Sequence, residues 1–265
     1  MKIYINGKLS DSIKITDRGF QFGDGLFETM VIHNGIVKDL DLHLSRMSSG
    51  AKRLGISFPV NWEEEIISIC KSLTHSVLKL ILTRGNSDLG LKLNLNNSPN
   101  RIIKISSFPA IIDKFQNDGI KMQICKIKMS CNPSFTDLKL LNWLEPAMAN
   151  LDLSDGYQEG LMLDMKGNIV EGTTSNFFAI KNNTLFTPDL THCGLSGITR
   201  DKILAIAKQM SMQVNVTNIT VADLANFDEC FISNSVINIY PVLRIENTKF
   251  KIDRARLFQD KLKYN

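Results

Sequence analysis

Short apolar runs joined by tight turns constrain this chain more than any other feature of its sequence. The strand-like segment KIYI is followed at once by an Asn-Gly turn, and Asn34-Gly35 separates two longer apolar runs in the pattern of a two-residue hairpin. Two further hairpins are predicted later in the chain, with turns at Lys166-Gly167 and Asn182-Asn183. Together with the helices described next, these strands predict a mixed α/β (α+β) fold.

Helical periodicity follows the first hairpin. Leu44, Met47, Ala51 and Leu54 share one face of a helix, and Gly55 is placed to end it. A second helix is expected in the segment NWEEEIISICKSL, with Asn61 as its N-cap and acidic residues in its first turn. Strand-like runs follow both helices, which indicates a compact α/β unit.

A loss of periodicity across residues 109–118 indicates a domain boundary. Strand-like alternation resumes beyond it, at Ile120, Met122 and Ile124. We therefore expect a smaller N-terminal α/β domain over residues 1–113 and a larger C-terminal domain over residues 119–265.

Composition excludes several classes of protein. A chain of 265 residues with 43% hydrophobic content can bury a full core, so disorder is excluded as the main state. The sequence has no run of eighteen apolar residues and no signal-peptide pattern, so we expect a soluble, cytoplasmic protein without a membrane partner. The net charge is +4, but Lys and Arg are dispersed among acids, so we expect no nucleic-acid partner.

The cysteines predict neither a metal site nor a disulfide framework. They are odd in number, widely scattered, without Cys-x-x-Cys spacing and without a histidine cluster near them. We interpret them as free thiols in a reducing compartment. The five are Cys70, Cys125, Cys131, Cys193 and Cys230.

Two glycines precede a predicted amphipathic helix that begins near Ile198. Because Gly194 and Gly197 leave the helix start uncovered, the backbone N–H groups of Ile198 and Thr199 would form an anion site suited to phosphate. The pattern alone is weak, since glycines before helices are ordinary loop residues.

Lys139 stands among leucines, with Leu138 before it and Leu140 and Leu141 after it. A desolvated lysine loses its charge more easily, and a neutral amine is the form that attacks a carbonyl. The alternative is a surface lysine whose ammonium reaches water along its own aliphatic stem.

Two more charged residues have a functional and an ordinary interpretation. Arg46 lies on the polar side of its predicted helix and could contact a phosphate with its planar guanidinium, or be one solvated arginine among many. Glu171 ends a predicted strand and could keep a proton on a partner nitrogen, or be a surface charge. With Lys139 and the anion site, these residues permit pyridoxal-phosphate chemistry, which needs an amine, phosphate donors and an acid at the ring nitrogen.

Six motifs in order carry a resemblance to a known family. They are RGFQFGDGLFET, HLSRM, LKLLN, EGTTSNFF, GLSGITR and ISNSVINIYPV. From about residue 3 to residue 245, the chain resembles the class IV (fold type IV) pyridoxal-phosphate enzymes, which include branched-chain and D-amino-acid aminotransferases and 4-amino-4-deoxychorismate lyase. The resemblance implies a two-domain fold like that of D-amino-acid aminotransferase, pyridoxal 5′-phosphate as cofactor, a small anionic substrate and a homodimer.

The resemblance also implies roles for single residues. Lys139 matches the lysine that forms the Schiff base with the cofactor, and Glu171 matches the partner of the pyridine nitrogen. Asn176 matches a motif asparagine to which we assign no role. The phosphate would be held by Arg46, by the backbone of Ile198 and Thr199, and by the hydroxyl of Ser235.

Within the family, the threonine at position 29 resembles the residue that the lyases carry there, whose hydroxyl is implicated in proton transfer. This implies conversion of 4-amino-4-deoxychorismate to 4-aminobenzoate and pyruvate for folate synthesis, with Lys139 as the base. One departure concerns substrate binding, because Leu89 and Leu91 replace residues that bind substrate in relatives. Arg84 or Lys92 could substitute for them.

Two alternatives remain open at this point. One is an aminotransferase acting on branched-chain or D-amino acids, which needs a clamp for the α-carboxylate of its substrate. The other is a basic nucleic-acid-binding or scaffold protein that keeps the fold without the cofactor, against which the dispersed charges argue.

Overall fold

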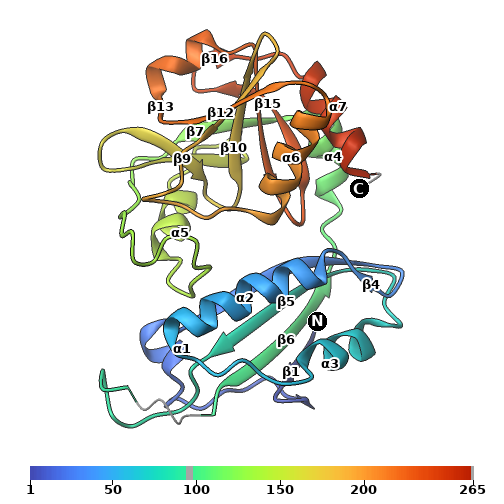
Figure 1. Ribbon diagram of the computed structural model, residues 1–265, viewed down its shortest axis with the longest axis vertical. Helices are drawn as coiled ribbons and strands as arrows, with labels where there is room; N and C mark the ends of the chain where they lie inside the picture. The colour runs from blue at the N-terminus through green and yellow to red at the C-terminus, as the bar shows by residue number, and fades with distance from the viewer. Residues whose placement is uncertain (94–97, 264–265) are drawn as a thin grey trace. The chain divides into compact units, whose positions relative to one another are not determined.

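The chain folds into two units that each contain helices and a sheet (Figure 1). The computed structural model describes residues 1–93 and 98–263. The first unit comprises Met1–Pro109 with Leu138–Asn142, and the second comprises Ala110–Asp137 with Trp143–Asn265. The mixed α/β class expected from the sequence is confirmed.

The first unit is built on an antiparallel sheet with the strand order β2-β1-β6-β5-β3-β4 among its described residues. Both predicted turns are present: Asn6 and Gly7, and likewise Asn34 and Gly35, have positive φ angles, which matches tight two-residue hairpins. The strands are β1 (Lys2–Ile5), β2 (Lys8–Leu9), β3 (Gly25–His33), β4 (Ile36–Val37), β5 (His75–Thr83) and β6 (Asn100–Ser107).

Helix α2 (Leu40–Leu54) packs on one face of this sheet (Figure 1). Of its predicted inner residues, Leu44, Met47 and Ala51 are buried and Leu54 is half-buried against the core. Gly55 ends the helix in the left-handed region with a φ of 65°. Each fully buried large apolar side chain contributes roughly 1.5–3 kcal/mol to folding, so this layer supplies much of the unit's stability.

Two shorter helices, α1 (Arg18–Phe22) and α3 (Trp62–Cys70), complete the unit. Asn61 occupies the N-cap position of α3 as expected, but its φ is 60° and its side chain makes no capping hydrogen bond. The capping interaction was therefore wrongly predicted. Three glutamates in the first turn still stabilise α3, because their negative charges lie near the positive end of the helix dipole.

The sheet of the second unit closes on itself. Its order within the described residues is β12-β11-β10-β14-β15-β7-β8-β9-β13, and an additional pairing of β10 with β9 joins six of these strands into a ring. Its strands are β7 (Ile120–Ile124), β8 (Glu159–Leu163), β9 (Asn168–Gly172), β10 (Asn176–Lys181), β11 (Thr184–Pro188), β12 (Gln213–Thr217), β13 (Ile219–Thr220), β14 (Glu229–Asn234), β15 (Asn238–Ile245) and β16 (Thr248–Lys249). The predicted hairpins at Gly167 and Asn182 join β8 to β9 and β10 to β11.

Helices α6 (Ile198–Gln209) and α7 (Asp253–Lys263) lie side by side against this sheet (Figure 1). Ile203 and Ala207 of α6 are fully buried. The remaining helices are α4 (Ile111–Asp118), α5 (Leu144–Leu151) and the 3₁₀ segment η1 (Val221–Asn226). None of the described helices has the length and apolarity that spanning a bilayer requires.

Two expectations are corrected here. We predicted a loss of periodicity across residues 109–118, but residues Ile111–Asp118 form the short amphipathic helix α4, whose buried residue is Ile112. Cys131 and Cys193 form a disulfide, so the interpretation of all five cysteines as free thiols is wrong. Their separation of 62 residues in the chain hides this pairing from sequence analysis, because only folding brings the two loops together. Cys70, Cys125 and Cys230 are free and buried.

Asp17 is a buried polar anchor of the first unit. Its carboxylate caps α1 by accepting hydrogen bonds from the N–H groups of Gly19 (2.8 Å) and Phe20 (3.2 Å). It also accepts from the hydroxyl of Thr83 at 2.6 Å and the amide of Asn100 at 2.7 Å. One fully buried side chain therefore ties α1 to β5 and β6.

We predict that Asp17→Ala lowers the free energy of unfolding by about 3 kcal/mol, because four donors, two of them from the buried side chains of Thr83 and Asn100, lose their acceptor. Urea unfolding of the purified protein measures this loss. The matched control Asp11→Ala removes an exposed carboxylate and should stay within about 0.5 kcal/mol of the wild type. A loss below about 1 kcal/mol for Asp17→Ala would contradict the role of the network.

Candidate active site

Lys139 lies in a short extended segment that pairs with β3. The N–H of Phe27 donates to the carbonyl of Lys139 at 2.9 Å, and the N–H of Leu141 donates to the carbonyl of Gly25 at 3.1 Å. In an extended segment alternate side chains point to opposite sides, so burial of Leu138 in the core directs Lys139 away from it. The leucines around Lys139 are explained by this pairing.

Two lysines lie at the ring of Phe27. The Nζ of Lys139 is 4.8 Å from the ring centroid, and the Nζ of Lys79 is 4.5 Å from it, both within range of a cation–π contact. Thr29 lies two residues along β3, on the same face as Phe27, and is paired directly with Lys79 of β5. This half-buried face, opposite α2, therefore presents a hydroxyl and two amines together.

Sequence analysis missed Lys79. Burial lowers the pKa of its ammonium group, and the neighbouring cation Lys104 lowers it further. The signal in the sequence was a single lysine within the apolar strand VLKLILT. Its directly paired neighbours in the sheet, Thr29 of β3 and Lys104 of β6, are also polar.

Arg46 is held by a buried carboxylate of its own unit. Its Nε and Nη2 each lie 2.7 Å from a different oxygen of Glu28, and His43 Nδ1 lies 2.6 Å from the Oε2 of the same group. Burial opposes the charge on Glu28, but hydrogen bonds from His43 and Arg46 outweigh it and lower the pKa of Glu28. Arg46 is thus not simply a solvated arginine, and the pair orients its guanidinium group.

Arg84 cannot serve as the substitute substrate clamp. Its Nε binds Asp24 at 2.7 Å, while its two terminal nitrogens donate to the carbonyls of Gly55 (2.9 Å) and Leu54 (2.7 Å) at the end of α2. The side chain is buried, so it has a structural role. Lys92, Leu89 and Leu91 are exposed.

Glu171 is buried at the end of β9, within the second unit. Its Oε2 accepts hydrogen bonds from the N–H of Leu195 at 3.1 Å and from the amide of Asn176 at 3.4 Å. A buried carboxylate held by N–H donors is stabilised in its charged form, which is the form that can keep a proton on a partner nitrogen.

Asn176, to which the sequence assigned no role, links Glu171 to the loop before α6. Its amide donates to the carbonyl of Leu195 at 2.7 Å as well as to Glu171. A Cβ on Gly197 would lie only 2.1 Å from the Oδ1 of Asn176, so glycine is needed there for the loop to pass this side chain. Asn176 is therefore a positioning residue.

The start of α6 has the properties of an anion site. Gly197 occupies the N-cap position, and no side chain caps the helix. The N–H of the preceding Ser196 donates to Asp137 at 3.1 Å, so an anion would use the N–H groups of Ile198 and Thr199, at the positive end of the dipole.

Ser235 lies in the turn between β14 and β15. Asn234 shapes this turn, because its Oδ1 accepts from the N–H groups of Val236 (2.8 Å) and Ile237 (2.9 Å). Its amide also donates to the carbonyl of Thr174 at 3.0 Å. The turn that carries Ser235 is thus fastened to the turn that follows Glu171.

Glu159 is a second buried carboxylate that sequence analysis missed. It accepts from the N–H of Gly160 (3.2 Å), from the N–H of Thr173 (2.8 Å) and from the hydroxyls of Thr173 and Thr174. Burial raises the pKa of Glu159 although the hydrogen bonds from Thr173 and Thr174 oppose the shift. The signal in the sequence was a glutamate at the start of the apolar run EGLML. A carboxyl group buried with such a run needs hydrogen-bond donors.

The donor set of the second unit fits pyridoxal phosphate. The uncapped start of α6 suits the phosphate, and the charged form of Glu171 suits the ring nitrogen. Within the described residues, the buried hydroxyl of Ser175, in the turn after Glu171, has no hydrogen-bond partner. A buried hydroxyl without a partner is expected where a bound molecule supplies one.

Known proteins resemble the chain over nearly its whole length. Residues 25–245 match the family described as amino-transferase class IV. The crystal structure of 4-amino-4-deoxychorismate lyase from Pseudomonas aeruginosa is similar with a TM-score of 0.95 and 33% identity, over 99% of this chain and 98% of that one. A putative branched-chain-amino-acid aminotransferase from Methanocaldococcus jannaschii is 33% identical over 93% of this chain and 88% of that protein. An aminodeoxychorismate lyase from Vibrio harveyi is 28% identical over 94% and 93%.

Two glycines with the same backbone conformation test the packing around Glu171. Gly194 and Gly167 both have a φ of 90°, but a Cβ on Gly194 would lie 2.7 Å from Val170 and 3.5 Å from the carboxyl carbon of Glu171. A Cβ on Gly167 would have no neighbour within 4 Å. Gly167→Ala therefore measures the backbone strain alone.

We predict that both alanine variants lose about 1–2 kcal/mol of stability from the left-handed conformation. Gly194→Ala should in addition displace Glu171 and weaken pyridoxal-phosphate binding, whereas Gly167→Ala should bind it normally. Urea unfolding and absorbance titration of the cofactor-free protein measure the two effects. Equal cofactor affinity in both variants would show that packing at Gly194 does not position Glu171.

Proposed function

Because the chain belongs to the class IV aminotransferase family, we propose that it is a lyase that converts 4-amino-4-deoxychorismate into 4-aminobenzoate and pyruvate. Enzymes of this family use pyridoxal 5′-phosphate, which is the cofactor of this chain. The similarity to the Pseudomonas aeruginosa and Vibrio harveyi lyases supports this choice of reaction.

The observation that carries the proposal is the group of side chains at Phe27. The substrate bears two carboxylates, and its reaction needs a base and a proton donor. The face around Phe27 offers the amines of Lys139 and Lys79 and the hydroxyl of Thr29. Cations beside an apolar ring suit a cyclic dianion.

When bound, pyridoxal phosphate supplies an aldehyde that condenses with amines and a protonated ring that draws electrons from the reacting carbon. Lys139 would provide the amine that holds the aldehyde. Glu171 would accept the N–H of the ring nitrogen and keep it protonated. The phosphate would be held by Arg46, by the N–H groups of Ile198 and Thr199, and by the hydroxyl of Ser235.

The released amine of Lys139 then removes the proton from ring C4 of the substrate. The bond between ring C3 and the enolpyruvyl oxygen breaks, and the ring becomes aromatic. Thr29 passes a proton to the departing enolpyruvyl group, which becomes pyruvate. General acid–base assistance of this kind contributes roughly 10² to 10⁴ in rate.

Two further features complete the proposal. The role of binding a substrate carboxylate falls to Lys79 and not to Arg84, because the guanidinium of Arg84 is already hydrogen-bonded to carbonyls at the end of α2. By analogy with the family, the protein is a homodimer that acts in the cytoplasm and supplies 4-aminobenzoate for folate synthesis.

A second candidate is a class IV aminotransferase acting on branched-chain or D-amino acids. The 33% identity to the Methanocaldococcus jannaschii protein favours it. Such an enzyme returns the amine to a 2-oxo acid, so the two candidates differ in their products.

We predict formation of 4-aminobenzoate and pyruvate in equal amounts from 4-amino-4-deoxychorismate. Lys139→Ala should reduce this activity by at least about 10⁴-fold, because both the covalent attachment and the base are lost. A parallel panel of amino acids and 2-oxo acids measures amine transfer. Fast transfer without 4-aminobenzoate would reject the lyase and support the second candidate.

We predict that Thr29→Val slows elimination by about 10²-fold or more while the cofactor still binds, because valine matches threonine in shape but lacks the hydroxyl. Thr29→Ser keeps the hydroxyl and should retain most of the rate. Single-turnover kinetics measure the elimination step. A normal rate for Thr29→Val would remove this residue from the mechanism.

We predict that Lys79→Ala raises KM by about 10- to 100-fold with a smaller change in kcat, because one charged hydrogen bond to the substrate is lost. Lys104→Ala is the matched control and should change KM at neutral pH by less than about threefold. In Lys104→Ala the pKa of Lys79 should rise, because the neighbouring cation that lowers it is removed. The increase of KM that follows deprotonation of Lys79 should therefore occur at a higher pH. An unchanged KM in Lys79→Ala would place the carboxylate elsewhere.

A further inference from the structure

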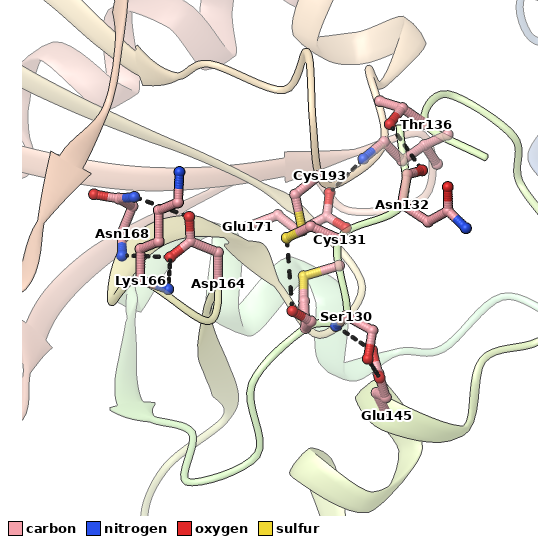
Figure 2. The surroundings of a disulfide bond; sticks show 12 residues. Ser130, Cys131, Asn132, Thr136, Glu145, Asp164, Lys166, Asn168, Glu171 and Cys193 are labelled. Atoms are coloured by element: carbon pink, nitrogen blue, oxygen red, sulfur yellow. Dashed lines mark hydrogen bonds between the residues drawn. A yellow bond between two sulfur atoms is a disulfide. The ribbon is translucent and has the colours of Figure 1, made fainter. Parts of the chain in front are cut away.

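The disulfide between Cys131 and Cys193 joins two loops of the second unit, with Cα atoms 4.7 Å apart (Figure 2). Cys131 lies in the exposed segment between β7 and α5, in the stretch that leads to Lys139. Cys193 lies in the loop of residues 189–197, which we name the cradle loop and which leads into α6.

The cradle loop contacts the candidate cofactor residues directly. The N–H of Leu195 donates to Glu171, and a Cβ added at Gly194 would lie 3.5 Å from the carboxyl carbon of Glu171. Cys193 itself packs in a small apolar cluster with Val170, the residue before Glu171 in β9. Figure 2 shows Glu171 beside the two cysteines. A shift of this loop would therefore move a donor to Glu171 and the start of α6.

Two noncovalent contacts also join these segments, and each is weaker than a covalent bond. The N–H of Ser196 donates to Asp137 at 3.1 Å, and Met129 packs against the cluster around Cys193. Asp137 is exposed, and a hydrogen bond in contact with water stabilises a structure by only about 1 kcal/mol. The disulfide is thus the strong link that holds the cradle loop to the segment around Cys131.

We propose that Cys131–Cys193 is a thiol–disulfide exchange site that controls cofactor affinity. The oxidised form holds the cradle loop in the conformation that binds pyridoxal phosphate, and reduction by a dithiol loosens the loop and weakens binding. This inference rests on the proposed roles of Glu171 and of the start of α6. It does not depend on which reaction the enzyme catalyses.

The dithiol alone supplies the electrons and protons that the exchange requires. Its thiolate attacks the Sγ of Cys131, which is on the exposed side of the bond, and the S–S bond breaks with Cys193 leaving as a thiolate that takes a proton. The second thiol of the reductant then attacks the mixed disulfide and releases Cys131 as a thiol. The protein gains two electrons and two protons, and the dithiol becomes a cyclic disulfide.

The other thiols are poor competitors in this exchange. Burial raises the pKa of Cys70 to about 11, and burial with the nearby carboxylates Glu159 and Asp152 raises the pKa of Cys125 to about 12. Burial also raises the pKa of Cys230. Because the thiolate is the reactive form, these three cysteines stay inert while Cys131 and Cys193 exchange.

The test compares cofactor binding in the two redox states of the whole protein. Cofactor-free protein is titrated with pyridoxal phosphate, as isolated and after treatment with dithiothreitol, and absorbance reports binding. Alkylation followed by mass spectrometry counts the thiols in each state. If about one reduced molecule in ten keeps the loop in place, the Kd for the cofactor rises about tenfold on reduction and returns on reoxidation.

Variants separate the disulfide from general effects of the reductant. Cys131→Ser should bind pyridoxal phosphate as weakly as the reduced wild type and should not respond to dithiothreitol. Ser130→Ala is the matched control, because it removes a neighbouring hydroxyl that binds Glu145 and leaves both cysteines in place. It should keep the full redox response.

Each outcome decides the proposal. Equal Kd values in the oxidised and reduced wild type, or free thiols at both positions in protein isolated without reductant, would overturn it. An intact protein that binds cofactor in a redox-dependent way but forms no 4-aminobenzoate would reject the proposed reaction and leave this inference standing. Formation of 4-aminobenzoate with unchanged cofactor affinity would do the reverse.

Discussion

The pairing of residues 138–142 with β3 is the interaction on which the candidate active site depends. Two main-chain hydrogen bonds, at Phe27 and Leu141, attach a segment from far along the chain to the sheet of the first unit. This attachment sets the alternation of the segment, so Leu138 enters the core while Lys139 points to the ring of Phe27. A register shift of one residue would reverse these positions.

Buried carboxylates organise the rest of the molecule. Asp17 fastens α1 to the sheet, and Glu28 orients Arg46. In the second unit, Glu171 is held by the loop before α6, and Glu159 holds the turn that follows Glu171. Each carboxyl group is buried with its donors in place, so each specifies a local geometry that apolar packing alone would leave loose.

Local patterns predicted much of the fold. The turns at Asn34-Gly35 and at Gly167 and the end of α2 at Gly55 all depend on residues that tolerate positive φ, and such signals are read within a few positions. Helix α4 was missed because it buries only Ile112, and the cap at Asn61 was wrong because its backbone is left-handed and not extended, as a capping residue requires. Lys79 was missed because its partners come from other strands, and Glu159 because its donors Thr173 and Thr174 lie in the turn after β9.

The sequence by itself determined the family, its cofactor and the local elements, since ordered motifs and short-range periodicity do not require knowledge of contacts. Only the tertiary structure decided that Arg84 is a structural residue, that Asn176 links Glu171 to Leu195, and that two distant cysteines meet. The physical reason is the same in each case. The partners Leu195, Leu54 and Cys193 lie 19, 30 and 62 residues from Asn176, Arg84 and Cys131, and only the complete set of packing and hydrogen bonds selects them.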